Sequence, residues 1–374
     1  MPFDTVELRI SLTKLLTAVV LVIVPLSLLG LYLTSRSYSS LEQSVGAQLR
    51  DVAQADSTAI AQFINDRVAE VRVLAAEPAV VNAVISANRT SAGAAEPLLS
   101  ERIEKTEADW NSPAGERLVG ELLSSPASLF LSRYKALEPR LLRLTVSDKN
   151  GAVVAASDKP SHYLQTTQPY WQAVFAQGRG STSVSDVLYS DEAQHEYIAI
   201  SLPILDETSQ QFIGAISALV GFGSPFGLMG LEQKGQGERR LLVHDDGTVI
   251  VGPNVNVSAK LKSDEFLAVR DALGTVRGRQ AGYVVTNTPE GPRIVGFADP
   301  GLNQTYPNLK WSVLVSYDMG EAMLPVLTVG RFAVFMVGLS LLMLILLGVY
   351  FYLHRKQQLA DIVMEEPLSP DRAA

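Results

Sequence analysis

The chain has 374 residues, of which 47% are hydrophobic, and its formal net charge is −8. The absence of cysteine excludes disulfides, thiolate metal sites and cysteine nucleophiles. The acidic residues are spread along the chain and no basic stripe occurs, so nucleic acid is not an expected partner.

The first element along the chain is an apolar segment without charge at residues 15–34. A helix of about 20 residues spans roughly 30 Å, which is the thickness of a bilayer's hydrocarbon core. We therefore expect a first transmembrane helix here, after a cytoplasmic N-terminus at residues 1–14. A cleaved signal peptide is the alternative, although its apolar core is usually only about 7–15 residues long.

A long amphipathic helix is expected next. From Tyr38 to Ser86, apolar residues recur at steps of three and four, which predicts a stalk helix that breaks near Pro78. Its apolar stripe suits either packing within the chain or a homodimer. Residues 88–138 predict short helices with turns near Pro113 and Pro126. Residues 35–138 are thus interpreted as a stalk and helical region.

The pattern then changes from helical to extended. Strands at Leu142–Val146 and Ala152–Ala156 flank one turn, and strands at Arg240–Val243 and Thr248–Val251 flank another. Both stretches read Leu-x-Val-x-Asp, about 97 residues apart, which indicates two similar modules at residues 139–225 and 226–325. Further strands are expected at Ser181–Tyr189, Glu196–Leu205, Phe212–Phe222, Gly282–Thr286, Arg293–Phe297 and Lys310–Ser316.

A second apolar segment, residues 329–353, predicts a second transmembrane helix. Flanking cations (Arg9, Lys14, Arg355 and Lys356) favour both termini in the cytoplasm. Residues 35–328 would then lie outside the inner membrane, in the periplasm or the extracellular space. The tail at residues 354–374 is too short for an output domain. Either a separate signalling protein receives the signal, or the domain is retained without autonomous signalling.

From Tyr38 to Pro325 this order of elements resembles the double Cache sensor domain of bacterial transmembrane receptors. The resemblance is carried by the long first helix, the two hairpins, and four segments: Gln168–Val174, Ile198–Ile204, Phe212–Ile216 and Trp311–Val315. It implies an α+β fold in which a stalk helix carries two tandem PAS-like modules with antiparallel sheets. The ligand would bind in the membrane-distal first module, between its sheet and the loops of residues 161–189.

The candidate ligand-binding residues lie in those loops: Tyr163, Gln168, Tyr170, Trp171, Asp186 and Tyr189. Aromatic rings of this kind form the walls of pockets for small organic ligands. The alternative for Tyr170 and Trp171 is packing at a helix start, and for Asp186 and Asp191 it is solvation at a strand end. His162 and His195 either face the same pocket or lie in surface loops.

The expected ligand is a small molecule other than a free amino acid. In the amino-acid-binding members of the family that the chain resembles, an arginine stands where this chain has Gln168. An aspartate stands near the place of Leu219. Without these partners a buried zwitterion would leave two charges unpaired, so a neutral or singly charged metabolite is favoured. No catalytic motif appears, and no enzyme activity, cofactor or metal is expected. The sequence therefore predicts a membrane-anchored sensor, and an envelope scaffold without a ligand is the alternative.

Overall fold

The computed structural model describes residues 12–93, 95–176, 180–190, 195–222, 237–252, 260–275 and 281–364. Contacts divide the chain into two compact units. One consists of residues 46–318, and the other of residues 1–45 and 319–374. The described strands all belong to the first of these units.

The second unit contains the start of helix α1 (Leu12–Ala75) and helix α9 (Met319–Met364). The apolar segments at residues 15–34 and 329–353 lie within these two helices. Among the helices that the structure describes, none has an apolar stretch long enough to cross a membrane. The two expected transmembrane helices therefore stay predictions.

In the unit of residues 46–318, the rest of α1 is followed by four helices. The expected break at Pro78 is confirmed, because α1 ends at Ala75 and Pro78 is the first residue of the next helix. The turn expected near Pro126 lies at Ser124 and Ser125, and Pro126 itself opens the next helix. Proline is tolerated in the first turn, and the Ser125 side chain caps the helix by accepting from the Ser128 N–H at 3.2 Å. The four helices are α2 (Pro78–Ala92), α3 (Glu96–Asp109), α4 (Glu116–Leu123) and α5 (Pro126–Leu137).

The first sheet is antiparallel and has the order β2-β1-β6-β5-β3, with β4 also paired to β5. One expected strand, at Ser181–Tyr189, is interrupted: it forms two short strands with Asp186 between them. The strands are β1 (Leu141–Asp148), β2 (Val153–Ala156), β3 (Ser183–Val184), β4 (Leu188–Ser190), β5 (His195–Leu205) and β6 (Phe212–Gly221). With helix α6 (Pro169–Phe175) these strands form what we call the first module.

The second sheet is also antiparallel, and its order is β8-β7-β11-β10-β9. Its strands are β7 (Glu238–His244), β8 (Val249–Val251), β9 (Ala281–Thr288), β10 (Gly291–Ala298) and β11 (Trp311–Asp318). With helix α8 (Asp264–Thr275) they form the second module. A short 3₁₀ helix, η3 (Leu302–Gln304), lies between β10 and β11.

The two modules repeat each other at the level of single hydrogen bonds. In the first, the Asp148 N–H donates to the Ala152 carbonyl at 2.9 Å; in the second, the His244 N–H donates to the Thr248 carbonyl at 2.9 Å. Gly151 and Gly247 take the same left-handed conformation, with φ of 82° and 83°. Equivalent residues of these hairpins are therefore 96 positions apart. This agrees with the repeat of about 97 residues inferred from the sequence, although the letters Leu-x-Val-x-Asp match one residue out of this register.

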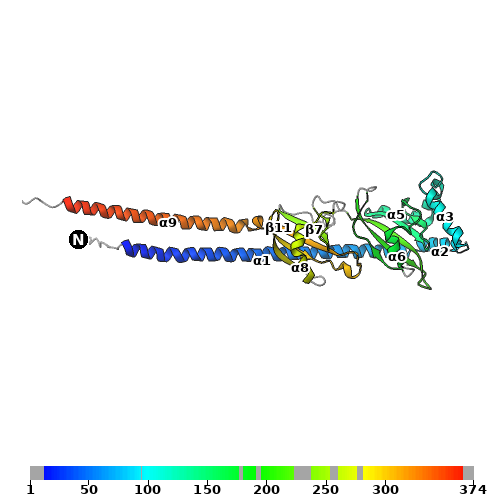
Figure 1. The fold of residues 1–374 in the computed structure, drawn as a ribbon, viewed down its shortest axis with the longest axis horizontal. Helices are drawn as coiled ribbons and strands as arrows, with labels where there is room; N and C mark the ends of the chain where they lie inside the picture. Colours follow the sequence, from blue (N-terminus) through cyan, green and yellow to red (C-terminus); the bar gives the residue numbers. More distant parts are fainter. Residues whose placement is uncertain are drawn as a thin grey trace, which may run out of the picture. The chain divides into compact units, whose positions relative to one another are not determined.

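Helices cover both faces of each sheet (Figure 1). In the first module, α6 packs on β5 and β6, while α2 and α5 pack on β1 and β2. In the second module, α8 packs on β9 and β10. The opposite face of that sheet meets α1 so closely that a Cβ on Gly296 would clash with the backbone of Leu49. The large apolar residues thus lie between each sheet and the helices on its faces, as layered packing requires.

Candidate ligand-binding site

The face of the first sheet that is turned towards α6 carries a row of hydroxyl groups. Residues opposite each other across antiparallel strands point to the same face. One such row crosses β1, β6, β5 and β3, and it consists of Thr145, Ser217, Ser201 and Ser183. We call these residues the hydroxyl row. The first three members are buried, and the Ser201 hydroxyl donates to the Ser217 hydroxyl at 2.8 Å.

Helix α6 places Trp171 on this face. The Trp171 indole N–H donates to the Ser147 hydroxyl at 3.0 Å. Its ring stacks on Phe175 at 4.9 Å between centroids and meets Phe212 edge-on at 6.3 Å. With 6% of its surface exposed, Trp171 is a member of a core cluster with Val174. The packing interpretation of Trp171 is therefore supported, and contact with a ligand stays a prediction.

Tyr170, its neighbour, is half-buried and lines a cavity. Its hydroxyl donates to Oε1 of Gln165. Burial raises the pKa of Tyr170 to about 12, and nearby Arg143 opposes the rise only in part. The phenol is thus neutral at physiological pH and retains its proton for hydrogen bonding.

Tyr163 belongs to a loop that is fastened to α3. Oε2 of Glu107 accepts hydrogen bonds from the backbone N–H groups of Tyr163 and Leu164, both at 2.7 Å. Oε1 of the same carboxylate lies 2.8 Å from Nδ1 of His162, whose side chain is half exposed. The ring of Tyr163 packs against Trp110 at 5.3 Å. These contacts give Tyr163 a packing role and support the surface-loop interpretation of His162.

The remaining candidate ligand-binding residues lie outside the hydroxyl row. Gln168 is the residue before α6 and makes no side-chain cap. Tyr189 lies in β4, paired with Glu196, and is half-buried. Asp191 and the side chain of His195 lie outside the described residues.

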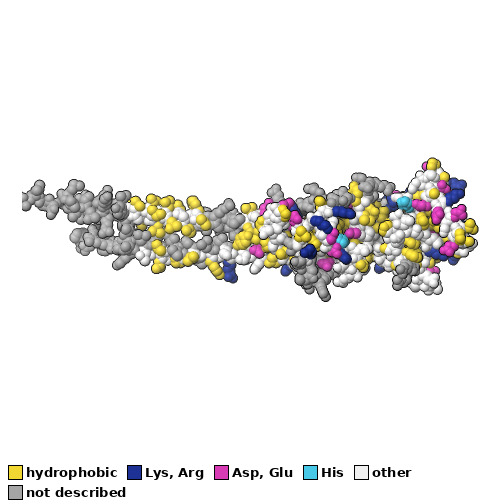
Figure 2. Space-filling model, viewed as in Figure 1, with side chains coloured by type: hydrophobic (Ala, Val, Ile, Leu, Met, Phe, Trp, Pro, Cys, Tyr) yellow, Lys and Arg dark blue, Asp and Glu magenta, His cyan; other side chains and the backbone are white. Residues whose placement is uncertain are grey.

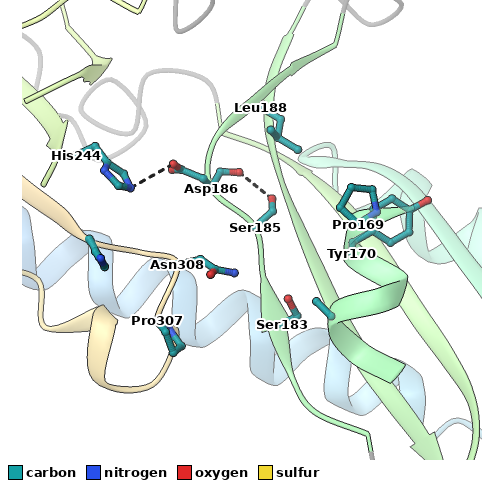
Figure 3. Close-up of a pocket in the computed structure, with 11 residues that line it drawn as sticks. Pro169, Tyr170, Ser183, Ser185, Asp186, Leu188, His244, Pro307 and Asn308 are labelled. Carbon is teal, nitrogen blue, oxygen red and sulfur yellow. Dashed lines mark hydrogen bonds and ion pairs between the residues drawn. The ribbon is translucent and has the colours of Figure 1, made fainter. Parts of the chain in front are cut away.

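A cavity of about 590 Å³ lies where the first module meets the second (Figure 3). Two of the predicted site residues, Tyr170 and Asp186, line it, together with Ser183 from the outer end of the hydroxyl row. The wall from the first module is completed by Pro169, Ala173, Ser185 and Leu188, and the wall from the second by His244, Pro307, Asn308 and Lys310. The predicted loops therefore do border a cavity, but its other wall is the second module rather than the sheet.

Charged groups lie on and near the wall that the second module gives to this cavity. Lys310 lies 3.2 Å from Asp245, and the Asp245 carboxylate also contacts Nδ1 of His244. Lys262 pairs with Asp246 at 2.6 Å and holds the pKa of that carboxyl well below its usual range. Figure 2 shows acidic, basic and histidine side chains gathered in this region of the large unit. Among the described residues, no group of three or more acidic or histidine side chains is placed to hold a metal ion.

Sequence reasoning missed the hydroxyl row and the wall from the second module. Thr145 and Ser147 stand at alternate positions of β1, so their hydroxyl groups point to the same face of the sheet. This pattern could have predicted a polar face. Nothing in the sequence links Asp186 to His244 or Lys310, because only the docking of two modules brings them together.

No family model matches the chain, and no curated protein matches it. Solved structures do. One is the ligand-binding domain of a Campylobacter jejuni chemoreceptor in complex with 4-methylisoleucine, with 13% identity, a TM-score of 0.48, and coverage of 76% of this chain and 94% of the other. Another is the ligand-binding domain of a Pseudomonas aeruginosa amino acid chemoreceptor in complex with GABA, with 14% identity, a TM-score of 0.46, and coverage of 73% and 100%.

A third is the sensor domain of a V. cholerae histidine kinase, with 13% identity, a TM-score of 0.44, and coverage of 75% and 98%. These structural neighbours are sensor or ligand-binding domains of chemoreceptors and histidine kinases, and they cover most of the chain. They are the kind of domain that the sequence resemblance named. With these identities and TM-scores, they say nothing about the ligand of this chain.

Proposed function

We propose that the chain is a membrane-anchored extracytoplasmic sensor that binds a small molecule in its first module. The observation that supports this most strongly is the hydroxyl row, which is buried at three of its four positions and ends at the cavity beside Tyr170. Each hydroxyl can both donate and accept a hydrogen bond, so such a row on a sheet face suits a polar ligand. The proposal includes no catalytic step.

The ligand class follows from charge. Leu219 lies near the place where amino-acid-binding members of the resembled family carry an aspartate. It is on the same face as the hydroxyl row, in register with Arg143 and Ala199. Gln168 stands in the place of the family's arginine. A zwitterion would lack both of these family partners, and Arg143 is a cation on this face, so we propose a neutral or singly charged metabolite with hydrogen-bonding groups.

The topology rests on the sequence alone. Residues 15–34 and 329–353 would be the two spans, the termini would lie in the cytoplasm, and residues 35–328 would lie outside the inner membrane. Within residues 35–328, the boundaries of the modules would be 139–225 and 226–325. The signal would pass to a separate protein at the membrane or in the cytoplasm. Two copies of the chain would form a homodimer through their stalk helices.

Thermal unfolding of the full chain in detergent tests the proposal. The probes are a panel of neutral sugars and polyols, monocarboxylates, monoamines and free amino acids. A ligand at 100 times its Kd stabilises by about 2.7 kcal/mol, which is a readily measured shift in Tm. We expect a saturable shift with a neutral or singly charged compound and none with amino acids.

The matched variants are Thr145→Val, in the hydroxyl row, and Thr208→Val, in an exposed turn. The first should lose the shift and the second should keep it. If no compound stabilises the chain, or if both variants respond alike, the receptor proposal fails and the envelope scaffold takes its place.

A further inference from the structure

Asp186 sits where the wall of the cavity is fastened to the first sheet. It lies between β3 and β4, which both pair with β5. The hydroxyl oxygen of its neighbour Ser185 accepts a hydrogen bond from the Ala199 N–H of β5 at 2.8 Å. The same hydroxyl donates to the backbone carbonyl of Asp186 at 2.7 Å. The Val187 N–H donates to Oδ1 of Asp186 at 2.8 Å. These bonds fix the direction of the Asp186 carboxylate.

That carboxylate reaches into the second module. The indole N–H of Trp311 donates to Oδ1 of Asp186 at 2.8 Å. On the other oxygen, Nε2 of His244 lies 3.6 Å from Oδ2 (Figure 3). Trp311 and His244 face each other in register as the first residue of β11 and the last of β7. One side chain of the first module therefore joins the paired ends of two strands of the second.

Trp311 is well placed to pass on a displacement. It is 2% exposed, and its ring packs against Phe222 at 5.4 Å, while Phe222 meets Phe63 of α1 at 6.2 Å. Strand β11 is paired on both sides, with β7 and β10, so it moves as a stiff element. It ends at Asp318, and α9 begins at Met319 without an intervening loop.

We propose that Asp186 is the positioning residue that couples the cavity to β11 and, along the chain, to α9. This inference rests on the proposed function, because it assigns a consequence to filling the cavity. A ligand that displaces residues 183–188 changes the Asp186–Trp311 hydrogen bond, and the start of β11 shifts between two packings.

Asp245 provides a matched control for Asp186. Its carboxylate is 47% exposed, against 40% for Asp186, and it also contacts His244, but it is bonded to Lys310 rather than to Trp311. The first measurement is backbone hydrogen exchange of the full chain in detergent, without ligand. In Asp186→Ala, we expect at least tenfold faster exchange in residues 183–188 and in the first half of β11. In Asp245→Ala, exchange in β11 should stay at the wild-type rate.

A second measurement fills the cavity without needing the natural ligand. The chain has no cysteine, so Ser183→Cys, on the cavity wall, can be labelled selectively with N-ethylmaleimide. Thr208→Cys, labelled in the same way in its exposed turn, is the control. We expect the label at position 183 to speed exchange at the start of β11, and the label at position 208 to leave it unchanged.

The decisive comparison repeats the labelling at position 183 in the Asp186→Ala and Trp311→Phe backgrounds. Trp311→Phe retains a ring against Phe222 but removes the indole donor. In both backgrounds the label should no longer change exchange in β11. Transmission that persists in either background overturns the inference, and so does a label that leaves β11 unchanged when Asp186 is intact. Because neither measurement uses the metabolite panel, failure here is distinguishable from failure of the receptor proposal.

Discussion

The two modules share one strand order and differ most on the face that each turns to its own helix. At the positions of Thr145, Ser217 and Ser201, the second module has Leu241, Leu314 and Phe297. Its apolar row belongs to a core cluster that Phe266 and Val269 of α8 complete. The same backbone thus carries a closed apolar core in one module and a buried polar face in the other. On the proposal above, the side chains of this one row, rather than the fold, would determine which module binds a ligand.

The difference predicts a large loss of stability when the apolar row is truncated. Phe297→Ala should lower the free energy of unfolding by about 3–5 kcal/mol, because it leaves a cavity in a packed core. Its counterpart Ser201→Ala should cost only about 1 kcal/mol, the value of one hydrogen bond. Chemical denaturation of the chain in detergent measures both.

Leu267→Ala, on the exposed side of α8, is the control and should change stability little. Equal losses for Phe297→Ala and Ser201→Ala would contradict the contrast between the two rows.

The opposite faces of the sheets differ in charge, which predicts a pH dependence at the second sheet that the equivalent position of the first sheet lacks. Arg240 of β7 lies 3.3 Å from Asp56 of α1, whereas the equivalent residue of the first module is the buried Leu144. Burial raises the pKa of Asp56 to about 6 from 3.8, because desolvation outweighs the attraction of Arg240, and Glu238 adds to the rise. The folded state therefore binds more protons than the unfolded state between these two values.

The contribution of Asp56 to the free energy of unfolding is therefore fully present below a pH of about 4. It falls by about 2–3 kcal/mol as the pH rises through about 6. The free energy of unfolding, measured between pH 4 and 8, should lose this slope in Asp56→Asn. Asp51→Asn, at an exposed position of the same helix, should keep it. A slope that is unchanged in Asp56→Asn would refute the assignment.

A smaller effect is expected where Trp171 donates to Ser147. Trp171→Phe retains the stacking on Phe175 but leaves the buried hydroxyl without its donor, at a cost of about 1–2 kcal/mol. The second module has Val243 at the position of Ser147 and needs no donor there. Combining Trp171→Phe with Ser147→Val should therefore recover much of the loss in denaturation experiments. A double variant that is less stable than Trp171→Phe would argue against this account.

The smallest change in stability should accompany the largest change in binding. Making the hydroxyl row more like its counterpart, with Thr145→Val and Ser217→Ala together, should alter the free energy of unfolding by only about 1 kcal/mol. The saturable thermal shift with the best compound of the panel should disappear. Tyr170→Phe should weaken that shift without abolishing it. A full shift in the double variant would exclude the row from the site.

The sequence predicted most strands and helices because their apolar periods of two and about 3.6 were plain. It predicted short helices over residues 88–138 but did not assign the start of α5, because Pro126 signals a turn and a first helical turn equally well. It also missed the break at Asp186, which depends on contacts with Trp311 and His244 in another module.

The difference between the modules was hidden by a slip of one residue. Aligning Asp148 with Asp245 pairs Leu144 with Leu241, so the two sheets look alike. The hydrogen bonds pair Asp148 with His244, and Leu241 then stands in the place of Thr145. Because side chains alternate between the faces of a strand, a shift of one exchanges every inward and outward residue. The matching residues of Leu-x-Val-x-Asp favoured the wrong register for this strand, and the backbone pairing corrects it.

The hydroxyl row also bears on how the recognition of ligands could change over generations. Each hydroxyl can rotate, so it offers either a proton or a lone pair to whatever faces it. A surface made of such groups tolerates compounds of opposite hydrogen-bonding sense without any movement of the backbone. Exchange of a single serine for alanine would then change which ligands are preferred. The cost in stability would be small, because the second module has a separate apolar core.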